Sequence, residues 1–313
     1  NLAELVSTVD VVRFVKHVLT PAGFPSKPLI TYLKSYKDLL NPKFKNKIIG
    51  DGVVLDVNSL YPSVMYESDL PFGTPIFFRG KYKKDDIYPL YTQMFKCQFE
   101  LKKNKIPTIQ IKYGSDFKGN EYLTSSNNLE VTLCLNSVDM DLFFEQYDVY
   151  NIEYISGWKF KCTKGLFTEY INKWSNNKIQ AKKDGNHGLY LISKLFLNSL
   201  YGKYGSDTTF RSKIPYLGDD DIIHFHDSEP EEKEGVYIAM ASFITSYARY
   251  KTITSAQRIM DNYNSGKSKI QFVYADTDSL KILNGYDKTI IDDYSGFIFT
   301  NRFGTVFSPH CIN

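Results

Sequence analysis

Two aspartates near the end of the chain lie in an otherwise apolar stretch. Asp276 and Asp278 belong to the run FVYADTDSLKI, residues 272–282, with one threonine between them. An ionised carboxylate in apolar surroundings costs free energy unless a metal ion or counter-charge accompanies it. Residues two apart in a strand project to the same side, so the pair predicts a cation site. The alternative, a turn that merely favours Asp and Ser, fits the tip but not the apolar residues on either side.

A third carboxylate is expected to join this pair. Asp56 ends the β-branched run GVVLDV at residues 52–57, directly before the turn sequence NSLYP. Aspartate is also common at such a junction as a cap, so its position alone is weak evidence. With Asp276 and Asp278 it would form an oxygen-rich site suited to Mg²⁺, which takes substrate phosphates as ligands. Two such ions stabilise in-line attack on phosphorus, which is the chemistry predicted here.

A cation, an amide and a phenol are expected on one helix face. Lys194, Asn198 and Tyr201 in the run KLFLNSLYG stand at positions i, i+4 and i+7. A lysine on such a face can hold triphosphate oxygens as a point charge. The alternative, a solvated lysine above a packed tyrosine, stays open at this point.

The elements that position these groups follow from the hydrophobic periodicity. The pattern predicts a strand over 52–57 and two strands over 270–283 that fold back at the aspartates. Two helices are predicted within 165–204, separated by the turn sequence DGNHG at 184–188. A long helix is predicted over 242–263. We therefore expect an α+β fold in which two strands fold back at the aspartates and a helical hairpin carries the lysine.

The remaining segments are less regular. Residues 71–157 mix strand and turn patterns, with a helix predicted over 138–147. Residues 206–240 are polar and acidic, with turns predicted at Pro215 and Gly218. At the other end of the chain, apolar residues at helical spacing predict a helix within 1–25.

Composition limits the function classes only loosely. A chain of 313 residues is expected to form two or more subdomains. The aromatic content of 15% suits base stacking or a β-rich core equally well. A net charge of +3 is too small to indicate a nucleic-acid partner, but seven lysines accompany one acid in residues 159–183. That segment could follow a phosphate backbone, whereas the acidic segment 219–234 should avoid one.

The four cysteines lie far apart, with no zinc-binding spacing, so reduced thiols in an intracellular protein are expected. We expect no membrane association, because no apolar run is long enough to span a bilayer.

Three motifs in order give this chain a family resemblance. DVNSLYP, KLFLNSLYG and YADTDS resemble motifs A, B and C of the family B DNA polymerases. The form DxNSLYP, with a long insertion before the second motif, resembles the protein-primed polymerases of the bacteriophage φ29 type. Further matches between the motifs include PTIQIK, GNEYL and FITSYARYKTITSAQ. The resemblance implies a right-hand palm with an antiparallel sheet, helical-hairpin fingers and two insertions.

The resemblance also implies roles for the carboxylates. Asp56 and Asp278, with Val57 among the metal ligands, would bind two catalytic Mg²⁺ ions, for which Mn²⁺ can substitute. Asp276 would assist. The primer 3′-hydroxyl, or the hydroxyl of a terminal protein, would then attack the α-phosphate of the incoming nucleotide.

Nucleotide-contacting residues follow from the same resemblance. Tyr61 would lie under the incoming sugar and discourage ribonucleotides. Lys194 would contact the phosphates, with help from Lys178 on the preceding helix. Tyr201 and Asn198 would contact the nascent base pair or support the nucleotide.

The resemblance divides the chain into six segments. They are 1–50, a remnant of the exonuclease side; 51–67, palm with motif A; 68–165, a first insertion that contacts terminal protein and duplex; 166–205, fingers; 206–240, a second insertion linked to processivity and strand displacement; and 241–313, palm with motif C and a divergent tail. Template-primer DNA, dNTPs and a terminal protein are the implied partners. An intracellular location is implied, in the host cytoplasm if a phage encodes the chain.

The exonuclease motifs and the thumb of this family have no counterpart in the sequence, so the chain is expected to be truncated. The alternative function is therefore a catalytically weak fragment that binds DNA or terminal protein and needs a second polypeptide for the missing parts. A third possible function is a phosphohydrolase that uses the aspartates of DTDS. In such enzymes, however, the aspartates lie on the first strand of a parallel sheet, early in the chain.

Overall fold

The structure of the chain is a computed structural model. It describes residues 52–57, 59–111, 121–206, 209–232, 235–284, 298–302 and 310–311. The helix predicted within 1–25 and the segment 1–50 lie outside these residues. Among the described residues, no helix combines the length and the apolarity that a membrane span requires.

A five-stranded antiparallel sheet carries the predicted aspartates. Its strands are β1 (Gly52–Val57), β12 (Gln271–Asp276), β13 (Ser279–Leu283), β14 (Ile298–Arg302) and β15 (His310–Cys311). They lie in the order β12-β13-β1-β14-β15. The strands predicted over 52–57 and 270–283 are thus confirmed, and so is the reversal at the aspartates. Strand β14, which pairs with the other side of β1, was not predicted.

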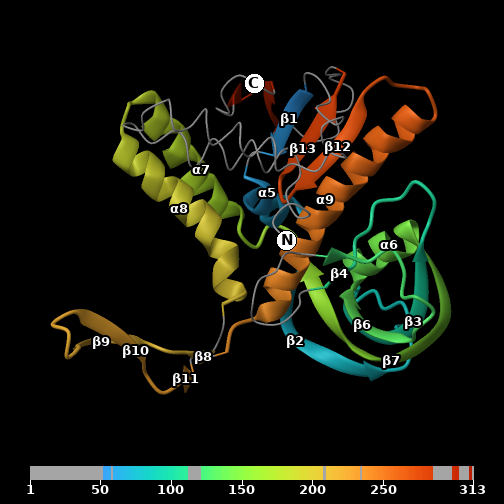
Figure 1. Cartoon of the computed structure of the whole chain (residues 1–313), viewed down its shortest axis with the longest axis horizontal. Helices are drawn as coiled ribbons and strands as arrows, with labels where there is room; N and C mark the ends of the chain where they lie inside the picture. Colours follow the sequence, from blue (N-terminus) through green and yellow to red (C-terminus); the bar gives the residue numbers. More distant parts are fainter. Residues whose placement is uncertain are drawn as a thin grey trace.

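The long helix α9 (Ile238–Asn264) packs on this sheet together with the short helix α5 (Leu60–Glu67) (Figure 1). Ile244 and Ile259 of α9 are fully buried, in one cluster with Leu280 and Ile282 of β13. Burial of a side chain of this size stabilises the fold by about 1.5–3 kcal/mol. The helix predicted over 242–263 is confirmed, and it begins four residues earlier than its apolar pattern suggests.

Two antiparallel helices form the predicted hairpin. They are α7 (Thr168–Lys183) and α8 (His187–Tyr204), which pack side by side (Figure 1). The turn uses Gly185 with a left-handed φ of 67°, which glycine adopts without steric cost. Asn186 then caps α8, because its side-chain oxygen accepts from the Leu189 N–H at 3.0 Å. Further along, Trp174 stacks on Phe196 with ring centroids 4.3 Å apart and joins the two helices.

Most of the chain between α5 and α7 forms a second sheet, which has four strands. It has the order β2-β7-β3-β6. Its strands are β2 (Leu70–Arg79), β3 (Leu90–Leu101), β6 (Val131–Asn136) and β7 (Tyr147–Thr163). Helix α6 (Ser137–Gln146) lies on this sheet and confirms the helix predicted over 138–147. A small pair, β4 (Gln110–Ile111) with β5 (Glu121–Tyr122), lies beside it.

A β-hairpin projects from the rest of the molecule (Figure 1). It pairs β9 (Lys213–Leu217) with β10 (Ile223–Asp227), and the short strands β8 (Thr209–Phe210) and β11 (Glu231–Glu232) pair at its base.

One sequence prediction fails in this hairpin. The turn predicted at Pro215 is wrong, because Pro215 lies within β9, opposite Phe225. A two-stranded hairpin leaves the outer edge of each strand free, so the missing N–H of proline costs little there. The turn predicted at Gly218 is confirmed, since the Asp221 N–H donates to the Gly218 carbonyl at 3.1 Å.

Candidate active site

A cavity of about 600 Å³ opens between the five-stranded sheet, α5 and the α7–α8 hairpin; we call it the carboxylate cavity. Its lining residues come from all three sequence motifs and from α7. They are Asp56, Val57, Ser59, Leu60, Tyr61, Pro62, Lys178, Ile179, Lys182, Tyr190, Lys194, Leu197, Asn198, Tyr201 and Asp278. Every predicted site residue whose side chain the structure describes is therefore brought to this one cavity.

The predicted carboxylates come from β1, from β12 and from the turn between β12 and β13. Asp56 in β1 lies opposite Ser279 in β13, and Ser279 lies opposite Asp276 in β12, so the three form one row across the sheet. The structure describes Asp276 by its backbone alone. Asp278 occupies the β12–β13 turn, and its carbonyl accepts from the Val57 N–H at 2.8 Å. This bond fixes the turn against the end of β1 and keeps Asp278 beside Asp56.

The turn is also held from the helix side. Thr277 adopts a left-handed φ of 45°, which is unusual for a β-branched residue. The Thr252 hydroxyl on α9 donates to the Thr277 carbonyl at 3.0 Å. A strained residue persists only where its surroundings hold it, and strain of this kind concentrates at functional sites.

The electrostatics of the cavity favour a bound cation. Burial, and then the nearby Asp278, raise the pKa of the Asp56 carboxyl to about 6, while Lys194 opposes the shift. Two carboxylates that share a site resist joint ionisation unless a cation neutralises them. Among the described residues, no group of three or more His, Cys, Asp or Glu side chains that could hold a metal ion is present, so the candidate site here is the pair Asp56 and Asp278.

Two described carboxylates suit a hard divalent ion such as Mg²⁺. This ion keeps several waters and completes its coordination with substrate phosphates. The residues present therefore fit the ion, because they leave most coordination positions to water and substrate.

The opposite wall of the cavity is cationic. Lys178 and Lys182 on α7 face Lys194 on α8 across the hairpin. The Lys178 ammonium donates to the Ser59 hydroxyl at 3.3 Å, which links α7 to the start of α5. Ammonium groups opposite carboxylates create a site for an anionic ligand that carries its own divalent cation, as a nucleoside triphosphate does.

Two of these lining residues were missed by the sequence analysis. Lys182 stands four residues after Lys178, and Tyr190 stands four residues before Lys194. Residues four apart share a helix face, so the helical phase of the predicted residues was the signal that could have identified both.

A stacked aromatic pair forms the floor between the two charged walls. The rings of Tyr61 on α5 and Tyr201 on α8 lie 4.0 Å apart at 18° to each other. Burial, and then the neighbouring Tyr201, raises the pKa of Tyr61 to about 12, so its hydroxyl stays protonated at neutral pH. Asn198 lies one turn before Tyr201 and lines the same cavity. The arrangement offers a flat surface and hydrogen-bonding groups to a sugar or a base.

Comparisons with known proteins agree with this geometry. The family model described as DNA polymerase type B, organellar and viral, matches residues 35–297. The DNA polymerases of Bacillus phage phi29 and Bacillus phage PZA are 47% and 46% identical to this chain over 254 residues, which are 81% of it. Among solved structures, the Phi29 DNA polymerase complexed with primer-template DNA and incoming nucleotide substrates superposes with a TM-score of 0.71 at 46% identity. This chain spans 42% of the length of each of these three proteins.

Proposed function

Because the chain belongs to the organellar and viral type B DNA polymerases, we propose that it is the catalytic core of a DNA-directed DNA polymerase. It has the antiparallel sheet and helical hairpin of their right-hand fold. The observation that carries the proposal is the carboxylate cavity, where acidic, basic and aromatic groups from separate sequence motifs meet. A nucleoside triphosphate with its metal ion needs this combination of groups.

We assign the metal ions to Asp56 and Asp278, with Val57 and Asp276 beside them. When bound, two Mg²⁺ ions neutralise the phosphates and lower the pKa of the attacking hydroxyl; Mn²⁺ supplies the same chemistry. The raised pKa of Asp56 supports the assignment, because an anion that lacks full solvation binds a cation more strongly. The protein's own contribution is to hold the two carboxylates side by side through the sheet pairing and the Val57–Asp278 bond.

The lysines are assigned to the triphosphate. Phosphoryl transfer depends mainly on position and on charge stabilisation, since there is little covalent chemistry for the protein to perform. The primer 3′-oxygen attacks the α-phosphorus, the bond to the β-phosphate oxygen breaks, and pyrophosphate leaves. Lys194 and Lys178 would hold the phosphates in line and stabilise the charge that develops on the leaving group. Lys182 would extend this cationic wall.

The aromatic floor is assigned to the sugar and base of the incoming nucleotide. Tyr61 is half-buried and stacks on Tyr201, so it cannot move aside without loss of that stacking. A 2′-hydroxyl above the Tyr61 ring would meet a fixed apolar surface, so we propose that Tyr61 discriminates against ribonucleotides. Asn198 and Tyr201 would support the nascent base pair.

The partners are proposed on the same basis. A solved relative was complexed with primer-template DNA and incoming nucleotides, and we propose these ligands for this chain. The terminal protein as a source of the first hydroxyl rests on the motif resemblance. The four-stranded sheet would be the first insertion of this chain, and the projecting hairpin would be its second insertion. Replication inside a host cell, in its cytoplasm for a phage protein, follows from this assignment.

Template-directed extension tests the proposal. The purified chain is given a primed DNA template, the four dNTPs and Mg²⁺, beside a doubly substituted Asp56→Ala, Asp278→Ala reference. We expect extension that chelation abolishes and Mn²⁺ restores. A mobility shift on the same DNA without extension would overturn the autonomous polymerase. It would instead support the alternative, a DNA- or terminal-protein-binding fragment that needs a second polypeptide.

A further inference from the structure

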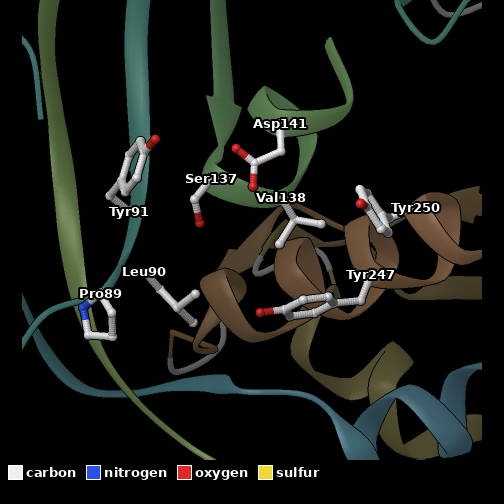
Figure 2. A pocket seen from close by; sticks show the side chains of 8 residues that line it. All are labelled: Pro89, Leu90, Tyr91, Ser137, Val138, Asp141, Tyr247 and Tyr250. Carbon is white, nitrogen blue, oxygen red and sulfur yellow. The ribbon is translucent and has the colours of Figure 1, made fainter. Parts of the chain in front are cut away.

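A second cavity, of about 400 Å³, lies where the four-stranded sheet meets α9, and it shares no lining residue with the carboxylate cavity. Figure 2 shows its side chains, and we call it the tyrosine pocket. Tyr91 comes from β3, Ser137 and Asp141 from α6, and Tyr247 and Tyr250 from α9, with Pro89, Leu90 and Val138 completing the lining. Its volume lies within the range of about 300–1,000 Å³ that is usual for ligand pockets.

The polar groups of this pocket have no partner in the described part of the chain. The Ser137 hydroxyl oxygen is buried and forms no hydrogen bond. The Asp141 carboxylate makes no ion pair there, and the phenol oxygens of Tyr91, Tyr247 and Tyr250 make no hydrogen bond. A buried polar atom without a partner is costly, so the Ser137 hydroxyl indicates a ligand that is yet to bind. Asp141 is exposed and the three tyrosines are half-buried, so their polar groups are accessible to the same ligand.

The neighbouring Asp139 differs from Asp141, because its carboxylate stabilises the contact between two helices. Asp139 lies two residues earlier on α6 and is fully paired. It accepts from the Ser246 hydroxyl at 2.6 Å and from the Arg249 guanidinium at 2.6 Å. Both bonds join α6 to α9. That interface therefore already has its ion pair, and Asp141 is free for another function.

The charged side chain in the lining of the pocket is the carboxylate of Asp141. Burial is the main cause that raises the pKa of Tyr91 and Tyr247 to about 12, and the field of Asp141 adds to both shifts. Asp69 also acts on Tyr247, and Glu145 acts with Asp141 on Tyr250. Burial likewise raises the pKa of the Asp141 carboxyl, although the residue remains exposed at the pocket mouth. A cation would be attracted here and a phosphate repelled.

We propose that the tyrosine pocket binds an arginine side chain of a protein partner. A guanidinium is planar, stacks on aromatic faces and presents five N–H donors. Asp141 can accept two of these donors side by side, and the serine and phenol oxygens can accept others. A lysine ammonium provides one point charge and no plane to stack on a ring. DNA phosphates fit this pocket poorly, because they would face Asp141 and no lysine or arginine is among the lining residues.

The proposal does not depend on the polymerase reaction. The pocket lies where α6 meets α9. The proposed arginine binding would therefore hold even if the chain were inactive without a second polypeptide. Tyrosine and arginine are the residue types most enriched at the energetic centres of protein interfaces.

A short peptide tests the proposal on the full chain. The probe is acetyl-Gly-Arg-Gly-amide, and the neutral isostere with citrulline and the analogue with lysine are the comparisons. Tyrosine ring carbons are labelled, and Tyr91→Phe and Tyr247→Phe identify their signals in the NMR spectrum. We expect the arginine peptide to shift both signals with a Kd on the order of 1 mM, with weaker binding of lysine and none of citrulline.

Variants distinguish binding in the tyrosine pocket from nonspecific attraction of the peptide to negative surface charge. Asp141→Asn should weaken the arginine peptide about tenfold, and Asp141→Glu should retain most of the affinity. Asp219→Asn, the same change in the exposed β9–β10 turn, should leave affinity unaltered. Ser137→Ala gives a second pocket variant if Asp141→Asn melts abnormally. Equal affinity in Asp141→Asn, equal binding of citrulline, or a shift of the same signals by primer-template DNA would each overturn the proposal.

Discussion

The carboxylate cavity and the tyrosine pocket use similar residue types and differ in one respect, the presence of cations. Both combine tyrosine rings with aspartate. In the carboxylate cavity Lys178, Lys182 and Lys194 face the acids, whereas the tyrosine pocket has no lysine or arginine in its lining. The first site is therefore complementary to an anion with its metal ion and the second to an organic cation. Local charge balance, more than the presence of aromatic groups, determines the class of ligand.

The largest expected effect comes from removal of a carboxylate that the lysines cannot replace. Asp278→Ala should lower single-nucleotide incorporation at least about a thousandfold, because both metal binding and charge stabilisation depend on it. Single-turnover kinetics on a primed template measure this. Asp219→Ala is the matched control and should retain full activity. Incorporation by Asp278→Ala within tenfold of the parent chain would contradict the assignment.

The cationic wall should matter less, and unequally. Lys194→Ala should reduce kcat/KM for dNTP by about 10- to 100-fold, the usual cost of one charge-assisted hydrogen bond. Lys182→Ala should reduce it by about threefold, because this lysine lies further along α7 from the Ser59-bound Lys178. Steady-state kinetics with one nucleotide compare the two. A larger effect at Lys182 would mean that the triphosphate lies deeper along the hairpin than we propose.

Sugar selection should depend on the aromatic floor alone. Tyr61→Val should reduce discrimination against ribonucleotides by about a hundredfold, whereas Tyr61→Phe, which keeps the ring, should change it by less than about threefold. The measurement is the ratio of kcat/KM for a dNTP and the matching rNTP. Loss of discrimination in both variants would assign the selection to the hydroxyl rather than the ring.

The smallest effect is on stability, and its sign distinguishes a metal site from a structural ion pair. The folded-state pKa of Asp56, about 6, lies above the ordinary value of 3.8, so folding favours the protonated acid. Stability from this group is present at low pH and is lost as the pH rises through about 4 to 6. Without Mg²⁺ at about pH 7.5, Asp56→Asn should therefore melt about 2–4 °C higher than the parent chain.

Differential scanning fluorimetry across pH measures this difference. It should shrink toward about pH 4, where the parent carboxyl is protonated, and also when Mg²⁺ is added at neutral pH. A variant that melts below the parent chain at neutral pH would indicate that Asp56 stabilises the fold as a paired ion.

Local patterns predicted much of the carboxylate cavity. The apolar runs around Asp56 and Asp278 predicted their strands, and DGNHG predicted the break between α7 and α8. Motif order then predicted that these elements meet. The position of the Asp276 side chain in the cavity remains a prediction, and so does the binding of metal ions by Asp56 and Asp278.

Features that depend on distant partners were not predictable. Strand β14 is set by its pairing with β1, and the order β2-β7-β3-β6 depends on a register that no single strand encodes. Pro215 was misassigned because only the fold shows that its strand has an open edge. The tyrosine pocket joins Asp141 to Tyr247 across separate elements, so its residues carried no common signal in the sequence.

The pairing of β1 with β13 also has a consequence for folding speed. It joins Gly52 to Leu283, and the four-stranded sheet, the helical hairpin and α9 all lie between them in the chain. Contacts between such distant residues slow folding, because the chain must lose the entropy of closing a long loop before the stabilising contacts can form. The entropy of that closure grows only slowly with length, by about 0.6 kcal/mol for each doubling. Asp56 and Asp278 should therefore meet late, after the intervening units have formed, and those units can lengthen or shorten at little thermodynamic cost to the site.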